Sequence, residues 1–154
     1  MKRIIVTGAN KGIGLAIVRR LLSEYDETFL ILAARSLERS EQSVSVLLNE
    51  NEAWKDRLVT LNLNVEHGDS VKEASQKILS LFTGISEPIH CLINNAGVGD
   101  SYLGMQRVLD VNTWGVQRVC EAFLPLICKK HGRIVNVTSA SGPNFVEKCD
   151  AITK

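Results

Sequence analysis

The fold is decided by one stretch near the N-terminus, Ile4-Ile5-Val6-Thr7-Gly8-Ala9-Asn10-Lys11-Gly12-Ile13-Gly14. A short apolar run typical of a buried strand leads directly into three glycines. The spacing of Ile13, Ile17 and Leu21 then predicts a helix. Glycines placed in this way allow a tight turn and a close approach of the backbone to a pyrophosphate, and a helix N-terminus offers free N–H groups to phosphate oxygens. We therefore predict a dinucleotide-binding turn.

Four further apolar runs follow along the chain, and helical patterns separate them. They are rich in Ile, Val and Leu without alternation, as in strands buried on both faces of a parallel sheet. The five predicted strands are Arg3–Thr7, Thr28–Ala33, Leu58–Leu63, Ile89–Ile93 and Arg133–Thr138. The last long helix is expected over Thr113–Cys128, with a C-terminal signal at Lys129–Gly132. This alternation predicts a single α/β domain over residues 1–154, a Rossmann-type doubly wound parallel sheet with strand order 3-2-1-4-5.

Composition excludes several classes of function. The 18 Lys and Arg balance 17 Asp and Glu, so we expect no nucleic-acid partner. No apolar run approaches the roughly 20 residues that span a bilayer, so we expect no membrane association. The N-terminus reaches glycine too soon for the apolar stretch of a signal peptide, so we expect a cytoplasmic location. The four cysteines form no Cys-x-x-Cys pair, which favours free buried thiols over a metal site.

The end of the second predicted strand indicates the cofactor. It reads Ala33-Ala34-Arg35-Ser36, without the carboxylate that accepts a hydrogen bond from the ribose 2′-hydroxyl of NAD. Arg35 and Arg39 offer guanidinium groups suited to a phosphate, and Lys11 in the glycine turn adds a cation. We predict NADP(H) as the cofactor. The alternative is that these cations only face solvent.

Four motifs in order resemble the short-chain dehydrogenase/reductase family. They are the glycine turn Thr7–Gly14, Asn94–Gly97 after the fourth strand, Asp110–Gly115 in the following helix, and Val135–Ser139 at the end of the fifth strand. The resemblance covers the whole chain and implies the fold derived above.

Two stretches most resemble the carbonyl reductases of that family. Gly8–Arg19 is one, and Val146–Cys149 resembles the start of a helical insertion in those enzymes. The resemblance implies NADPH-dependent reduction of a ketone or aldehyde carbonyl on a small-molecule substrate. Asp110–Asn112 and Ala122–Pro125 also resemble hydroxysteroid dehydrogenases, so a steroid or retinoid substrate stays open.

The resemblance also implies roles for particular residues. Ser139 would polarise the substrate carbonyl, with Ser141 as a weaker candidate for the same role; the alternative for Ser139 is a turn serine. Asn112 would hold a water in a proton relay, and its alternative is a satisfied buried amide. Asn62 stands where the family usually has an Asp that contacts adenine, and its carbonyl oxygen can accept from the adenine amine. The expected cofactor-binding residues are Gly8, Asn10, Lys11, Gly12, Ile13, Gly14, Arg35, Arg39, Asn62, Leu63, Asn95, Ala96 and Gly97.

One element of the family pattern is missing from the sequence. The resemblance implies a proton-donating Tyr with a Lys four residues later, but Tyr25 and Tyr102 are followed at that spacing by Phe29 and Gln106. The chain is therefore expected to be an N-terminal portion of the family fold, truncated after the fifth strand, with self-association through the exposed edge of that strand. A catalytically inactive nucleotide-binding remnant or interaction module is the alternative to a working reductase.

Overall fold

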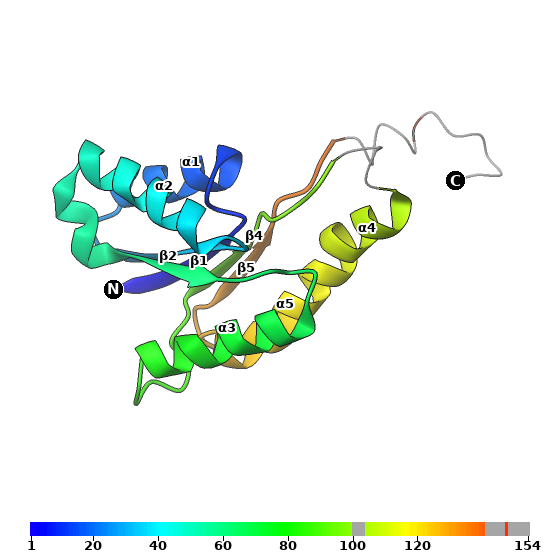
Figure 1. Ribbon diagram of the computed structural model, residues 1–154. Coiled ribbons are helices and arrows are strands. Elements are labelled where there is room, and N and C mark those ends of the chain that lie inside the picture. Colours follow the sequence, from blue (N-terminus) through cyan, green and yellow to red (C-terminus); the bar gives the residue numbers. More distant parts are fainter. Residues whose placement is uncertain (100–103, 141–146, 148–154) are drawn as a thin grey trace.

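The computed structural model describes residues 1–99, 104–140 and 147, and contains one parallel sheet with helices on both faces (Figure 1). In chain order, its elements are β1 (Lys2–Thr7), α1 (Gly12–Glu24), β2 (Thr28–Ala34), α2 (Leu37–Glu50), the 3₁₀-helix η1 (Glu52–Arg57), β3 (Leu58–Asn62), α3 (Gly68–Leu81), β4 (Cys91–Asn94), α4 (Met105–Leu109), the π-helix η3 (Asp110–Gly115), α5 (Val116–Phe123), the 3₁₀-helix η4 (Leu124–Leu126) and β5 (Arg133–Asn136). The strand order is β3-β2-β1-β4-β5, which confirms the predicted Rossmann-type doubly wound sheet.

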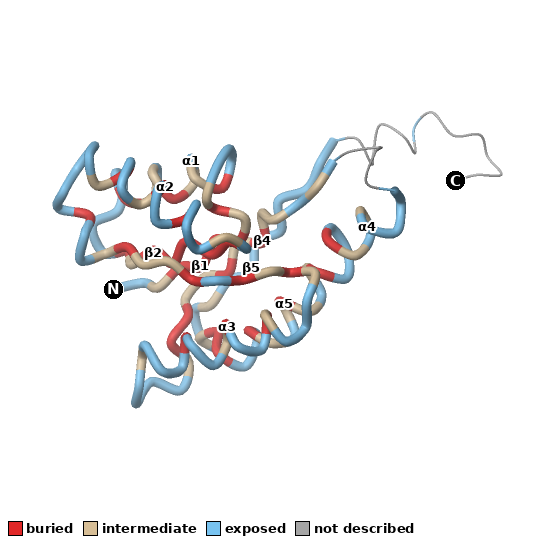
Figure 2. Tube along the Cα trace, in the orientation of Figure 1, coloured by how far each residue is buried: buried red, intermediate tan, exposed pale blue. Residues whose placement is uncertain are grey.

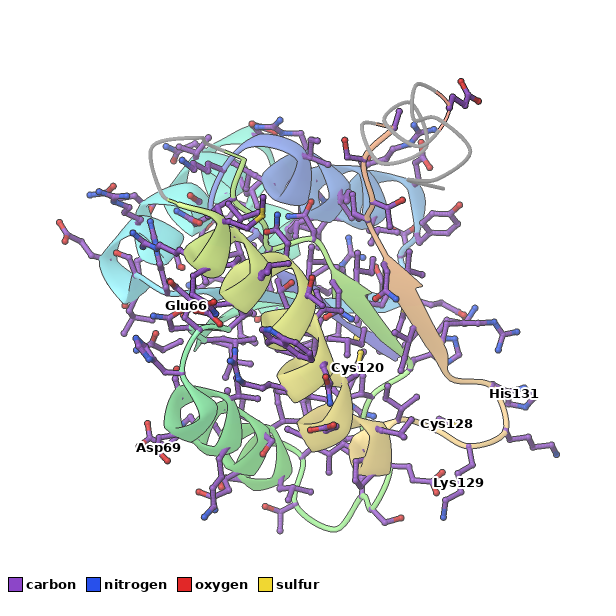
Figure 3. The ribbon with its side chains drawn as sticks, turned by 90° about the vertical axis from the view of Figure 1, so that its right-hand side faces the viewer. Glu66, Asp69, Cys120, Cys128, Lys129 and His131 are labelled. Carbon is purple, nitrogen blue, oxygen red and sulfur yellow. The ribbon has the colours of Figure 1, made fainter. Side chains whose placement is uncertain are left out.

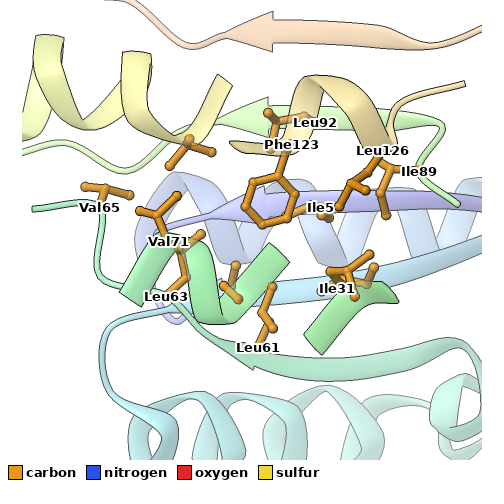
Figure 4. Close-up of a cluster of buried hydrophobic side chains, with 14 of the residues drawn as sticks. Ile5, Ile31, Leu61, Leu63, Val65, Val71, Ile89, Leu92, Phe123 and Leu126 are labelled. Atoms are coloured by element: carbon orange, nitrogen blue, oxygen red, sulfur yellow. The ribbon is translucent and has the colours of Figure 1, made fainter. Parts of the chain in front are cut away.

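Each face of the sheet has its own apolar core because successive side chains of a strand point to opposite faces. Ile5 and Ile31 pack with residues of α3 and α5 on one face, where Phe123 is fully buried (Figure 4). Ile4 and Val6 pack with residues of α1 and α2 on the other face. The central strands are consequently the most buried part of the molecule (Figure 2).

All five strands differ from their predicted bounds: β1, β2 and β3 differ by one residue, and the larger differences are at the start of β4 and the end of β5. β4 begins at Cys91 because the main chain of Ile89 pairs instead with the end of η4 and the residues after it. The Ile89 N–H donates to Leu126 O at 2.9 Å, and its carbonyl accepts from the Cys128 N–H at 2.8 Å. β5 ends at Asn136, two residues before the predicted end. The apolar run of the sequence therefore extends beyond the ladder in both places.

The predicted helix Thr113–Cys128 is wrong in its bounds. Helical structure begins earlier, at Met105, and α5 ends at Phe123. Pro125 has no N–H to continue the helical ladder, so the chain tightens into the 3₁₀-helix η4 instead. Lys129–Gly132 is consequently no helix end; the Gly132 N–H closes a turn onto Cys128 O at 2.6 Å.

β5 lies at one edge of the described sheet and its side chains are exposed. Ile134, Val135 and Val137 are 38%, 44% and 42% exposed, although their sequence is that of a buried strand. Helices flank the other four strands, whereas this strand has little cover (Figure 2). An unpaired strand edge with apolar side chains is a template for association. Self-association there stays a prediction.

The cysteines that the structure describes are free thiols. Cys91, Cys120 and Cys128 are half-buried, and burial raises the pKa of the Cys91 thiol above its ordinary value. Cys149 lies outside the described residues. Within residues 1–99, 104–140 and 147, no three His, Cys, Asp or Glu side chains converge as a metal site. No helix in the same part of the chain has the length and apolar character needed to cross a bilayer.

The C-terminal end of α1 is satisfied by an arginine from a distant part of the sequence. The side chain of Arg57 is only 11% exposed, and its guanidinium donates to Leu22 O and Tyr25 O at 2.9 Å and to Asp26 O at 3.2 Å. The last carbonyls of a helix have no partner within the helix, and a cation there also complements the helix dipole. Arg57 therefore joins α1, the start of β2 and η1.

Replacing Arg57 with methionine is expected to lower the free energy of unfolding by about 2–3 kcal/mol, because three main-chain carbonyls lose the charged donors of a largely buried guanidinium. Urea unfolding of the purified chain measures this. Arg20→Met is the matched control, since Arg20 is exposed and its side chain pairs, among the described residues, only with Glu24 one turn away; its loss should stay below about 0.5 kcal/mol. Equal losses for the two variants would contradict this account of Arg57.

Candidate cofactor-binding site

The glycine turn after β1 brings three segments together backbone to backbone. Gly8 has a φ of +64°, and a Cβ there would lie 2.8 Å from Ala96 Cα. Gly14 is buried in the first turn of α1, where a Cβ would lie 2.5 Å from Asn95 Nδ2 and 2.6 Å from Gly8 O. Gly12 has a φ of +55° with open space around it. The first two positions need glycine for close packing, and Gly12 needs it for its backbone conformation.

A pocket of about 550 Å³ lies at the carboxyl ends of the strands, beside this turn. Doubly wound sheets bind ligands at this edge, where the strand order reverses between β1 and β4. Most of the predicted cofactor-binding residues line it: Gly8, Asn10, Lys11, Gly12, Ile13, Gly14, Arg35, Leu63, Asn95, Ala96 and Gly97. Six further residues that the sequence did not predict also line it: Ala34, Asn64, Val65, Glu66, Val98 and Val111.

The N-terminus of α1 forms part of the pocket wall. The wall includes the N-cap residue Lys11 and the first helical residues Gly12 to Gly14. No side chain of the described residues caps this end, and the first turn of α1 holds no acidic residue. The first N–H groups of a helix have no partner within the helix, and the helix dipole makes this end partly positive. The pocket therefore offers a site for an anion such as a pyrophosphate.

Thr7 and Asn95 hold the two loops of the pocket together. Thr7 is only 1% exposed, and its hydroxyl accepts from the N–H groups of Asn95 and Ala96, both at 3.0 Å. In return Asn95 Nδ2 donates to Thr7 O at 2.9 Å. One step deeper, Asn94 Nδ2 donates to Asn136 Oδ1 at 2.9 Å and so links β4 to β5. The segment Asn94–Gly97 therefore shapes the pocket wall and braces the strands around it.

The predicted phosphate-binding cations occupy different positions. Lys11 is exposed at the pocket and forms no ion pair with any described residue. Arg35 also lines the pocket, and its Nη1 lies 3.9 Å from Glu66 Oε2. Arg39 is not in the pocket wall: Ser36 caps α2, which places Arg39 in the exposed first turn of that helix. Two of the three predicted cations therefore face the pocket.

The structure does not bring Asn62 into the pocket wall either. Leu61 and Leu63 are buried in the core under α3 and α5, so Asn62, between them, points the other way and is exposed. Its neighbour Asn64 lines the pocket instead and accepts from the Glu66 N–H at 3.1 Å. The alternation of side chains along β3 accounts for the orientation of Asn62, whereas Asn64 lies beyond the end of that strand.

Asn112 makes two hydrogen bonds with one residue of the loop after β4. Its Oδ1 accepts from the Val98 N–H at 2.9 Å, and its Nδ2 donates to Val98 O at 2.7 Å. Asn112 lies in the π-helix η3, a rare element found often at functional sites. Its side chain is exposed, so the alternative of a buried amide is wrong. The side-chain amide positions the pocket loop, while the proposed water relay stays a prediction.

Ser139 lies beyond the carboxyl end of β5 and is exposed. The last ladder hydrogen bond joins the Val137 N–H to Asn94 O at 2.9 Å, two residues before Ser139. The serine therefore stands at the same edge of the sheet as the pocket, but it is not part of the pocket wall. The neighbouring weaker candidate, Ser141, lies outside the described residues.

The sequence matches the family model for the short chain dehydrogenase over residues 2–149. The chain belongs to the short-chain dehydrogenase family. The family is one of oxidoreductases that use nicotinamide cofactors. The glycine turn and the segment Asn94–Gly97 lie where the resemblance implies them, and the strand order of the sheet is the one it implies.

Relatives within the short-chain dehydrogenase family differ in what their names say they act on. The mitochondrial D-beta-hydroxybutyrate dehydrogenase of Bos taurus is 36% identical over 149 residues, covering 92% of this chain and 42% of the relative. Carbonyl reductase (NADPH) 1 of Mus musculus is 31% identical over 152 residues, covering 94% and 51%. An alcohol dehydrogenase from Thermococcus sibiricus complexed with 5-hydroxy-NADP superposes with a TM-score of 0.75 at 32% identity, covering 90% of this chain and 58% of that one. The chain spans about half the length of the curated relatives it matches.

Proposed function

We propose that the chain binds NADP(H) in this pocket and forms the cofactor-binding part of an oxidoreductase that reduces a ketone or aldehyde carbonyl. The observation that supports it most is the uncapped N-terminus of α1, which faces a pocket with Lys11 and Arg35 in its wall. The residues fit the cofactor, because close packing at Gly8 and Gly14 holds the glycine turn beside the pocket, where the N–H groups at the start of α1 can meet a pyrophosphate.

Each part of the pocket has a role in this proposal. The N–H groups at the start of α1 bind the pyrophosphate, and Lys11 with Arg35 binds the 2′-phosphate. The segment Asn95–Gly97 forms the wall beside the glycine turn. The bound cofactor supplies hydride chemistry at its nicotinamide ring. Ser139 would polarise a small-molecule carbonyl substrate at the same edge of the sheet.

Lys11→Ala is expected to raise the Kd of NADPH about tenfold, because loss of one charged contact to a phosphate removes roughly 1.4 kcal/mol of binding free energy. The Kd of NADH should change less than about twofold, since it has no 2′-phosphate. Fluorescence titration of the purified chain measures both. Lys72→Ala on the exposed side of α3 is the control and should leave both constants unchanged. Equal losses for the two cofactors would contradict the role of Lys11.

A second candidate function is nucleotide binding without turnover. It is favoured by the sequence itself, which has no Tyr followed by Lys at the spacing that the family resemblance implies. An assay of NADPH oxidation with a quinone or a reactive ketone distinguishes the two. Turnover that Ser139→Ala abolishes supports the reductase; NADPH binding without turnover supports the second function.

The cytoplasmic location also stays a proposal, supported by the free thiols of the described residues.

A further inference from the structure

Glu66 is an acidic side chain in the wall of a pocket that the proposal fills with phosphates. Glu66, which Figure 3 labels, lies in the loop between β3 and α3. Its side chain is 19% exposed and stands between two guanidinium groups. Oε1 lies 3.1 Å from Nε of Arg107 on α4, and Oε2 lies 3.9 Å from Nη1 of Arg35 after β2. One carboxylate thus faces the arginine assigned to the 2′-phosphate and a second arginine outside the pocket wall.

The loop that presents Glu66 is fixed by hydrogen bonds on each side of it. The Glu66 N–H donates to Asn64 Oδ1 at 3.1 Å, and the Asn64 N–H donates to Ser70 Oγ at 2.9 Å. Arg118 reaches from α5 to donate to Val65 O at 3.0 Å. The carboxylate therefore cannot leave the pocket wall by a simple shift of its backbone, and Arg107 holds its outer oxygen.

We propose that Glu66 is a specificity-determining residue that competes with the cofactor 2′-phosphate for Arg35. A phosphate bound to Arg35 would come close to a carboxylate of like charge, which weakens its binding. Arg107 neutralises part of that charge and so limits the competition. The inference rests on the proposed function, because it requires the adenosine end of a cofactor beside Arg35. Its consequence is a preference for NADPH over NADH that is smaller than Lys11 and Arg35 alone would produce.

The alternative is a purely structural role, in which Glu66 only ties α4 to the loop after β3. The two readings differ in a measurable way. If the role is structural, loss of the contact between Glu66 and Arg107 would weaken the binding of every adenosine ligand alike and lower the melting temperature of the protein. Competition for Arg35 affects only ligands with a 2′-phosphate.

The test measures the Kd of adenosine 2′,5′-bisphosphate and of adenosine 5′-monophosphate, which differ only in the 2′-phosphate. Calorimetric titration of the 154-residue chain gives the ratio of the two constants for each variant. Glu66→Gln should raise the preference for the bisphosphate about fivefold, and Arg107→Met should lower it about twofold, the size expected of one partly screened charge. Asp69→Asn, an exposed acid of α3 outside the pocket wall, is the matched control for net charge and should leave the ratio unchanged.

The outcomes separate this inference from the proposed function. Binding of both ligands with an unchanged ratio in Glu66→Gln overturns the role of Glu66 and leaves the proposed function standing. A wild-type ratio near one contradicts the NADP preference, yet a rise in Glu66→Gln still supports the competition. No binding of either ligand to the wild-type chain overturns both proposals.

Discussion

Gly14→Ala is expected to lower the free energy of unfolding by about 3 kcal/mol, the upper part of the range for overpacking a well-packed site. The added Cβ would meet Asn95 Nδ2, Gly8 O and Ala9 Cα at 2.5, 2.6 and 2.8 Å. Two of these atoms belong to the backbone of the turn, so α1 must move away from β1. Because that movement displaces the wall of the pocket, measurable NADPH binding should be lost as well.

Urea unfolding and NADPH titration of Gly14→Ala measure both effects. Gly68→Ala is the matched control, because Gly68 begins α3, and a Cβ there meets nothing within 4 Å. Alanine is also the better helix former, so the control should be neutral or slightly stabilising. A Gly14→Ala chain as stable as the wild type would show that α1 does not pack on the turn in the way described.

Thr7→Val is expected to cost about 2–4 kcal/mol of folding free energy, with almost no change in side-chain size. Valine cannot accept from the N–H groups of Asn95 and Ala96, which the buried hydroxyl now satisfies at 3.0 Å each. An unsatisfied buried donor costs about 1–3 kcal/mol, more than the hydrogen bond itself contributes. The loop after β4 should loosen, and the affinity for NADPH should fall with it.

Two further variants isolate the hydroxyl of Thr7. Thr60→Val makes the same substitution in β3, at a half-buried position, and should change stability by less than about 0.5 kcal/mol. Thr7→Ser keeps the hydroxyl and should recover most of the loss. Equal denaturation midpoints for Thr7→Val and Thr60→Val would contradict the bracing role.

The sheet and the glycine turn could be predicted from the sequence because their signals are local. Ile4 to Val6 form an uninterrupted apolar run, and the glycines follow at once. The ends of strands were predicted less accurately where long-range pairing decides them. At the start of β4, the main chain of Ile89 pairs with the segment around Ile127 and not with β1. The end of α5 had a local signal in Pro125, but the cationic residues further along suggested a longer helix.

The candidate site was predictable where one motif forms it and less so where segments meet. Most residues of the turn line the pocket as expected, but Arg39 and Asn62 do not, because helix capping and strand alternation direct them elsewhere. Glu66 was missed, although an acidic residue shortly after a strand that ends at the ligand-binding edge is a usable signal. Its partner Arg107 comes from a helix 41 residues away and has no local signal at all.

The central claim is that this chain folds around a pocket for NADP(H), and a thermal melt of the 154 residues with and without cofactor tests it most directly. A ligand that binds only the folded state adds about 2.7 kcal/mol of stability at a hundredfold excess over its Kd. We predict one cooperative transition that NADPH raises more than NADH does at the same concentration. A transition that neither cofactor moves, or that NADH raises more, would contradict the claim.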